Sequence, residues 1–427
     1  MLFPSLASKP YIRVWRHREF ALYESGMTLY SVTGWIQRVG VGWMAWELTH
    51  STFWLGVMSA ADLGPMILLA PFAGAVADRM DSWKLSRASQ FLMMMQAIAL
   101  CLLMYTGYMG IYTLLAVSLY TGCLYPFSGA ARQTLLPRTV PHSEFATAIA
   151  IDSAAFQAAR FIGPAIASLI IPFFGVMAAF IVHGCGSIAF QTAIAFMRLP
   201  PEQILARGHR NIFRDVGESF VYVRNHTGIG SIFMMMVVVS LLIRPINDML
   251  PGFAGAVFHG GARELAWLTS SVGVGAMVSA STIAMRGGVE GLTLRVFGGL
   301  AGLTLATAVL VGTDFLPLGV IGAGLYGYTL NTMSTSTQAL TQTAVADDMR
   351  GRVMSLYMLI FRGIPAIGGV AVGIAAQYLG LRWTFAASAA ICGLLWLMVM
   401  PRRYFIAEAL EGPRARSPRA GSKAFMR

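Results

Sequence analysis

The chain has 427 residues, of which 56% are apolar and only 12% are charged, and its formal net charge is +12. Soluble domains carry about 25% charged residues, so this composition excludes an ordinary soluble protein. Apolar runs recur along the whole chain without strict alternation, and each is close to the roughly 20 residues that a membrane-spanning helix needs. The sequence therefore predicts an all-α membrane protein.

Twelve apolar segments follow one another along the chain, and we expect each of them to form a transmembrane helix. They span residues 20–46, 53–77, 86–107, 110–133, 147–172, 175–197, 229–256, 264–285, 293–312, 316–341, 353–378 and 382–400. A longer polar stretch separates the first six from the last six. Membrane transporters are commonly built from two such halves, so we predict two six-helix bundles.

The less apolar segments complete the predicted organisation. We expect a cytoplasmic N-terminal segment (1–19), an N-terminal six-helix bundle (20–197), a cytoplasmic linker (198–228), a C-terminal six-helix bundle (229–400) and a basic, disordered cytoplasmic tail (401–427). Apolar residues recur every three to four positions from Ile212 to Val223 in the linker. This spacing predicts an amphipathic helix that lies on the membrane surface.

The basic residues predict the orientation of the chain. If the N-terminus is cytoplasmic, most of the 31 Lys and Arg residues fall on the cytoplasmic side, and the expected outer loops hold Arg263 and Arg382. The positive-inside rule then places both termini in the cytoplasm, in a multi-pass protein of the cell inner (plasma) membrane. This bias explains the net charge without nucleic acid. The expected partners are therefore the lipid bilayer and a small-molecule substrate, and we expect a monomer.

A short polar loop, Gly74–Lys84, joins the second and third expected spans. Gly74 would let another helix approach closely. Asp78 would accept hydrogen bonds from the N-terminal end of a neighbouring helix or pair with a basic residue there. Positive-inside topology alone accounts for Arg79 but not for Asp78. We predict that Gly74, Asp78 and Arg79 belong to a cytoplasmic gate that closes in one state and opens in the other.

Charged residues inside the expected spans are the candidate functional residues. Each Arg or Asp at a helix centre costs at least about 2.5–3.5 kcal/mol and marks a functional site by default. The candidates are Glu24, Arg38, Asp62, Asp152, Arg160, Arg244, Asp248 and Arg362, with His183 as a neutral one. Glu24 and Asp152 lie about a turn from the cytoplasmic end, where an interfacial position explains them, and His183 is typical of a packed helix residue. The other six are predicted to serve proton coupling and the substrate cavity.

Two pairs stand out among these six residues. Arg38 and Asp62 lie at a similar depth in neighbouring spans. A carboxyl there would bind a proton without its partner and release it beside the arginine, so Asp62 is the first candidate for the proton-binding group. A permanent structural pair is the alternative. Arg244 and Asp248, four residues apart on one helix face, could pair with each other, either for structure or for substrate.

Several motifs of the chain resemble a known family. The G-x-x-x-D-R loop between the second and third spans resembles the signature loop of the major facilitator superfamily. Within it, the chain looks like the branch of the enterobactin exporter and macrolide-efflux-type permeases, called transmembrane secretion effectors, from about Phe20 to Arg403. The motifs that carry this resemblance are Trp46–Ser51 with Leu55-Gly56, Pro71 with Gly74 and Asp78-Arg79, Ala131–Pro137, Arg160–Pro164, Leu250-Pro251 and Arg350–Ser355.

The resemblance implies a secondary transporter that uses a proton gradient as its energy source and needs no cofactor. The chain also departs from the superfamily pattern. Asp81 stands where glycine is usual, Ser82-Trp83 replaces basic residues, and the matching loop Arg286–Gly291 has lost the motif. Ala167 replaces a glycine of the antiporter-type motif of the fifth span. These departures bear on the direction of transport and on proton coupling.

We therefore predict a secondary active transporter that exports a small amphipathic compound, drug-like or siderophore-like, by alternating access coupled to proton antiport. One alternative is an uptake permease or uniporter of the same fold, and another is a transport-inactive membrane sensor or scaffold. The sequence contains no G-x-x-x-x-G-K-[ST] loop, which argues against an ATPase. It also has no recognisable catalytic or metal-binding constellation, so we expect neither an enzyme nor a metal protein.

Overall fold

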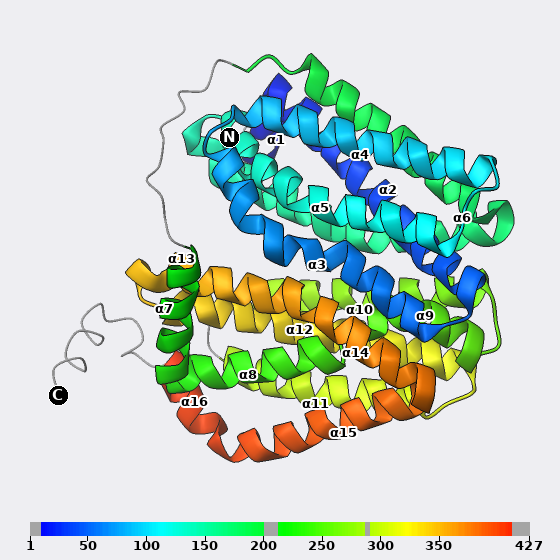
Figure 1. The fold of residues 1–427 in the computed structure, drawn as a ribbon. Helices are drawn as coiled ribbons and strands as arrows, with labels where there is room; N and C mark the ends of the chain where they lie inside the picture. Colours follow the sequence, from blue (N-terminus) through cyan, green and yellow to red (C-terminus); the bar gives the residue numbers. More distant parts are fainter. Residues whose placement is uncertain (1–9, 200–211, 287–290, 412–427) are drawn as a thin grey trace, which may run out of the picture. The chain divides into compact units, whose positions relative to one another are not determined.

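The computed structural model describes residues 10–199, 212–286 and 291–411, and the regular elements in these ranges are helices (Figure 1). The chain divides into two compact units. The first comprises Met1–His50 with Gly64–Gly208, and the second comprises Ser51–Leu63 with His209–Arg427. Helix α3 (Thr52–Ala77) therefore begins in the second unit and ends in the first. The expected N-terminal bundle, 20–197, differs from the first unit chiefly in this segment.

The helices of the first unit lie where the hydropathy of the sequence predicts them, to within a few residues. They are α1 (Pro10–Val14), α2 (Arg18–Thr49), the later part of α3, α4 (Ser82–Tyr105), α5 (Ile111–Leu135), the 3-10 turns η2 (Leu136–Arg138) and η3 (His142–Glu144), and α6 (Phe145–Phe196). Helix α6 joins the two expected spans 147–172 and 175–197. Its backbone is interrupted at Gly175, where φ is 77° and ψ is 172°, a conformation that glycine adopts without a steric penalty.

Contacts with α2 show that the chain reverses its direction at Gly175. A Cβ atom added to Gly163 would lie 2.4 Å from Cβ of Trp35. Beyond the interruption, a Cβ on Gly40 would lie 3.2 Å from the Phe180 ring, and one on Gly26 would lie 2.8 Å from the Phe190 ring. The contact point on α2 thus moves from residue 35 to residue 40 and then back to residue 26. The two halves of α6 are therefore two separate membrane crossings.

The second unit contains the remaining helices, several of which are interrupted. They are α7 (Ile212–Asn225), α8 (Thr227–Leu242), α9 (Ile246–Gly252), the π turn η4 (Phe253–Val257), α10 (Ala262–Arg286), α11 (Leu292–Val311), α12 (Leu316–Ala344), α13 (Asp347–Met358), the π turn η5 (Leu359–Gly363), α14 (Ile364–Leu379), α15 (Leu381–Val399), the 3-10 turn η6 (Met400–Arg402) and α16 (Arg403–Glu411). The expected span 229–256 consists of α8, α9 and η4, and the expected span 353–378 consists of α13, η5 and α14.

Glycines let α10 and α12 pack backbone against backbone. A Cβ atom on Gly275 would lie 1.9 Å from the carbonyl oxygen of Gly324, and one on Gly327 would lie 2.0 Å from that of Val272. No larger residue fits at either glycine without moving the helices apart. Close packing through small residues is the usual way in which helices associate inside a membrane.

In the ranges that the structure describes, nine helical segments are long and apolar enough to cross a membrane. One of them, His142–Phe196, contains the reversal at Gly175 and so accounts for two crossings. Helices α2 and α12 have 32 and 29 residues and are long enough to cross, but their polar residues keep them out of the nine. These observations are consistent with the predicted twelve crossings.

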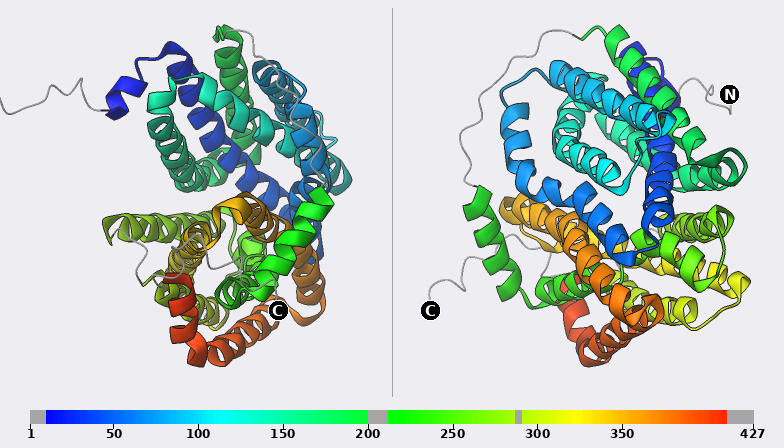
Figure 2. Two further views of the ribbon diagram at one scale, coloured as in Figure 1. Left: turned by 90° about the vertical axis from the view of Figure 1, so that its left-hand side faces the viewer. Right: turned by 45° about the vertical axis from the view of Figure 1, so that its right-hand side comes forward.

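The linker and the tail both contain helices. Helix α7 forms where the amphipathic pattern predicts it, and Glu218 on α7 makes an ion pair with Arg352 on α13. Helix α16 follows α15 and packs against α8 and α11 (Figures 1 and 2). The prediction of disorder over 401–427 is therefore wrong for residues 403–411, because Ile406 and Leu410 are buried and hold this segment against the second unit. Residues 412–427 and 200–211 lie outside the described ranges.

Candidate functional site

In the first unit, two of the predicted arginines lie beside one tryptophan. The guanidinium of Arg38 is 5.6 Å from the centroid of the Trp35 ring, and that of Arg160 is 5.9 Å from it. Arg38 and Trp35 belong to α2, whereas Arg160 belongs to α6. Both distances are within the range of a cation–π attraction. The predicted site residues Arg38 and Arg160 are therefore brought together around the ring of Trp35.

The sequence of α6 explains how Arg160 reaches Trp35. Gly163 lies one turn further along, and its missing side chain lets α2 and α6 touch at Trp35. Pro164 has no N–H group, so the carbonyl of Arg160, four residues earlier, lacks its usual helical hydrogen bond. The motif Arg160–Pro164 thus combines a charged side chain, a close helix contact and a locally weakened helix.

In the second unit, Arg244 lies against an aromatic surface. Its guanidinium is 3.9 Å from the centroid of the Phe361 ring, and this ring stacks on Tyr357 at 5.7 Å. Arg244 occupies the break between α8 and α9, immediately before Pro245. The fourth predicted arginine, Arg362, lies in the π turn η5 next to Phe361. Interrupted helices and π turns are frequent at functional sites in membrane and soluble proteins.

A small cavity of the second unit lies beside Arg244. Phe361, Ser240, Met333 and Thr337 are among the residues that line it together with Arg244. The hydroxyl groups of Ser240 and Thr337 are buried, and neither has a hydrogen-bond partner within the described part of the chain. Buried polar groups in proteins are usually hydrogen-bonded, so these two hydroxyls are suited to bind a polar group of a ligand.

The predicted acidic residues have the following surroundings. Asp248 accepts a hydrogen bond of 2.7 Å from the Ser59 hydroxyl, within the second unit. Asp62 also belongs to the second unit and is half-buried, whereas Arg38 belongs to the first. The predicted pairs Arg38–Asp62 and Arg244–Asp248 stay predictions.

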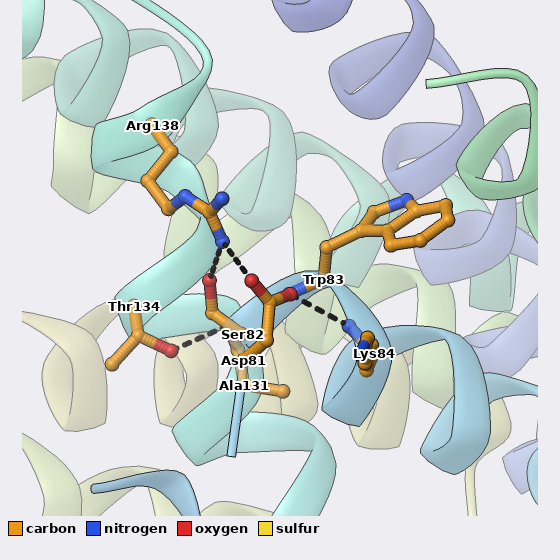
Figure 3. Close-up of polar contacts among 7 residues, drawn as sticks. All are labelled: Asp81, Ser82, Trp83, Lys84, Ala131, Thr134 and Arg138. Atoms are coloured by element: carbon orange, nitrogen blue, oxygen red, sulfur yellow. Dashed lines mark hydrogen bonds and ion pairs between the residues drawn. The ribbon is translucent and has the colours of Figure 1, made fainter. Parts of the chain in front are cut away.

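At the start of α4, Asp81 organises the loop that follows α3. Its carboxylate accepts hydrogen bonds from the backbone N–H groups of Trp83 (2.9 Å) and Lys84 (3.2 Å), which makes it the N-cap of the helix (Figure 3). Arg138 approaches from η2 and contacts both the Asp81 carboxylate (3.4 Å) and the Ser82 hydroxyl (2.6 Å). The residue that departs from the superfamily pattern therefore joins α4 to η2.

Of the predicted gate residues, two have exposed side chains, and the third, Gly74, has open surroundings. The side chains of Asp78 and Arg79 are exposed, and no described atom lies within 4 Å of a Cβ atom built on Gly74. The close helix approach at Gly74 and the gate stay predictions. Sequence reasoning missed the role of Asp81, although an acidic residue just before an apolar helix is a typical N-cap signal.

Two further candidates lie inside the first unit. His183 is buried, where its ring nitrogens are 3.2 Å and 3.4 Å from the hydroxyls of Thr33 and Ser187. This environment is that of the packed helix residue that the sequence indicates. Glu24, by contrast, is only 1% exposed. Its side chain is therefore covered by protein, and its interfacial position stays a prediction.

Comparison with known proteins identifies the family. A family model described as transmembrane secretion effector matches residues 15–413. The chain belongs to this family. Members of the family are transporters of the major facilitator superfamily, and the chain is accordingly a multi-pass membrane transport protein. The predicted family is thereby confirmed.

Two relatives illustrate the family relationship. The staphyloferrin A transporter of Staphylococcus aureus is 23% identical over 382 residues, which cover 88% of this chain and 93% of the relative. The uncharacterized MFS-type transporter YfiS of Bacillus subtilis is 22% identical over 419 residues, covering 91% and 95%.

Among solved structures, the nucleoside transporter NupG has a TM-score of 0.70 at 12% identity and covers 90% of this chain and 98% of its own. A bacterial homologue of the lysosomal transporter Spinster has a TM-score of 0.65 at 13% identity, covering 94% and 99%. At these identities the likeness shows the fold alone. The all-α transporter fold predicted from the sequence is confirmed.

Proposed function

We propose that this transporter exports a small amphipathic compound, drug-like or siderophore-like, in exchange for protons. The observation that carries the proposal is the small cavity beside Arg244. It is lined by a guanidinium, an aromatic ring and the buried hydroxyls of Ser240 and Thr337, which have no hydrogen-bond partner among the described residues. An apolar body would pack on Phe361, and oxygen acceptors would bind the guanidinium and the hydroxyls. The pairing of Arg38 and Arg160 with Trp35 offers guanidinium groups beside an aromatic ring in the first unit.

Arginine suits this task because its planar guanidinium stacks on aromatic rings and donates up to five hydrogen bonds. A side chain held against a ring is already oriented, so the protein loses little conformational entropy when a ligand binds. Compounds with an aromatic or aliphatic body and several oxygen acceptors therefore fit both arginine–aromatic pairs. The relative named as a staphyloferrin A transporter supports a siderophore-like compound.

The direction and the coupling rest on other grounds. The description of the family as a secretion effector supports export. Asp62 is a carboxyl at membrane depth, where competition between a proton and the substrate is the simplest coupling scheme. Uptake or uniport by the same fold, and a transport-inactive sensor or scaffold, are the alternatives. Probe flux separates the scaffold from a transporter, and a pH gradient across vesicles of known orientation separates export from uptake and uniport.

The purified protein in proteoliposomes provides the test. Staphyloferrin A and fluorescein, which have several oxygen acceptors, serve as probes, and ethidium serves as an aromatic cation. We expect saturable flux of at least one acceptor-rich probe and little flux of ethidium. Selective flux of ethidium would contradict the proposed substrate chemistry. Absence of flux for all three, with the protein folded and in a stable complex with another protein, would favour the scaffold.

Matched variants locate the binding site. Thr337→Val removes a cavity hydroxyl, and one neutral hydrogen bond contributes about 0.5–1.5 kcal/mol, so we expect the KM for the transported probe to rise about 3- to 10-fold. Thr307→Val is the control, because its hydroxyl is also buried without a described partner but does not line the cavity. Equal KM values for the two variants would place the binding site elsewhere.

A further inference from the structure

Glu24 is a buried carboxyl that belongs neither to the cavity beside Arg244 nor to the predicted gate. It lies on α2 and is 1% exposed. One of its oxygens accepts a hydrogen bond of 3.3 Å from the Thr28 hydroxyl. The other, Oε2, is buried and has no hydrogen-bond partner within the described ranges of the chain. A carboxylate held in this way would be poorly compensated, whereas a carboxylic acid carries no charge.

The charged groups around Glu24 come from the two helices packed on this part of α2. Arg132 on α5 and Asp152 on α6 form an ion pair of 2.6 Å, and both act on Glu24 electrostatically. Of these two side chains, 24% and 13% are exposed. On α2 itself, the buried Tyr23 hydroxyl and Thr28 are the other polar neighbours.

The geometry of α2 and α6 agrees with this placement. The first half of α6 runs in the same direction as α2, because the second half runs antiparallel to α2 and the chain reverses at Gly175. Trp35 and Gly163 touch. Glu24 and Asp152 precede these two residues by the same interval, about three helical turns. Both carboxyls therefore lie at the same level of the unit.

This arrangement contains two carboxyls and one arginine. With the Arg132–Asp152 pair formed, the cluster is neutral only if Glu24 carries a proton. Interacting carboxyls of this kind share their protons as a coupled group. We propose that Glu24, with Arg132 and Asp152 as its positioning residues, is the proton-binding site of this transporter. The proposal rests on the proposed proton exchange, and it replaces Asp62 of the second unit by Glu24 of the first unit as the carboxyl that carries the proton.

Release of the proton is a simple acid dissociation. The O–H bond of the Glu24 carboxyl breaks, its electron pair stays on the oxygen, and solvent water takes the proton. The resulting carboxylate competes with Asp152 for Arg132. Glu24, Trp35 and Arg38 also lie on one stripe of α2, at positions i, i+11 and i+14. A change in the charge of Glu24 thus acts on α2, the helix that also carries Trp35 and Arg38.

Infrared spectroscopy of the purified, substrate-free protein in lipid tests the proposal. At neutral pH we expect a C=O stretching band of a protonated carboxylic acid that Glu24→Gln abolishes. Glu47→Gln is the matched control on the same helix, since Glu47 accepts a 2.7 Å hydrogen bond from Trp43, and it should keep the band. A band that survives Glu24→Gln, or a native protein without such a band, would overturn the proposal.

Asp152→Asn adds a second, independent readout. It frees Arg132 for Glu24, so the proposal predicts that Glu24 ionises and the band disappears although Glu24 is intact. A band that persists in this variant would refute the sharing of one arginine. None of these measurements needs a substrate. If flux proves independent of the pH gradient while the band behaves as expected, proton exchange fails as the function and proton binding at Glu24 stands.

Discussion

Replacement of Gly163 by alanine tests the helix contact that brings Arg160 to Trp35. The added Cβ atom would lie 2.4 Å from Cβ of Trp35 and 2.7 Å from the carbonyl oxygen of Val32. Carbon atoms in contact prefer about 3.5–4.0 Å, so α2 and α6 must separate by about 1 Å. Overpacking of this kind costs about 1–3 kcal/mol, and alanine recovers about 0.5–1 kcal/mol of helix propensity. We expect a net loss of about 1–2 kcal/mol.

Thermal unfolding of the purified protein in detergent measures this loss, and proteoliposome flux measures its effect on transport. We expect the midpoint of Gly163→Ala to fall by a few degrees and its KM to rise, because Trp35 and the guanidinium of Arg160 move apart. Gly129→Ala on α5 is the control, since no described atom lies within 4 Å of its added Cβ. If both variants unfold at the same temperature, the close contact of α2 and α6 at Gly163 is refuted.

Three further predictions concern the loops and the tail. Asp81→Ala removes the N-cap of α4 and should lower the free energy of unfolding by about 1–2 kcal/mol. Asp78→Ala should leave the free energy of unfolding within about 0.5 kcal/mol of the native value and should reduce flux if the gate prediction holds. The reverse order of stabilities would contradict the structure. Glu411→Gln weakens the hydrogen bonds of 2.7 Å and 2.6 Å that Glu411 accepts from backbone N–H groups at the start of α11. It should lower the free energy of unfolding, measured by thermal unfolding, by about 0.3–1 kcal/mol. An unchanged stability would show that α16 does not dock on α11. Burial lowers the pKa of His226, which in its neutral form caps α8. Its contribution to stability is therefore complete above about pH 6.5 and is lost as the pH falls through the lowered pKa. His226→Gln should flatten the pH dependence of the unfolding midpoint in that range, and an unchanged profile would show that His226 does not cause this dependence.

The membrane crossings are predictable because hydropathy is a local property of the chain. The ends of α3, α5 and α11 lie within a few residues of the expected ones. Interruptions within a span are harder to predict, because they depend on tertiary contacts. Pro245 is visible in the sequence, but the π turn η5 is not. Helix α16 was missed because its two buried residues, Ile406 and Leu410, are too few to give a hydropathy signal.

The functional residues show a similar division. The cost of charge in a membrane selects Arg38, Arg160 and Arg244 from sequence alone. Trp35 lies one helical turn before Arg38, but the contacts of Arg160 with Trp35 and of Arg244 with Phe361 can be found only once helices are packed. For Glu24 the sequence gives the depth along its helix, but it does not show that neighbouring helices cover the side chain. The sequence comparison marks Asp81 only as a departure from the superfamily pattern, and not as the N-cap of α4.

Proton-driven transport in proteoliposomes of known orientation tests the central claim most directly. Vesicles are prepared with the cytoplasmic side outward, the transported probe is supplied outside, and the inside is made acidic. The account predicts that this pH gradient accelerates accumulation of the probe, that protons leave the vesicle as it enters, and that a protonophore abolishes both effects. Flux that is indifferent to the gradient, or that is accelerated only by the opposite gradient, would contradict export in exchange for protons.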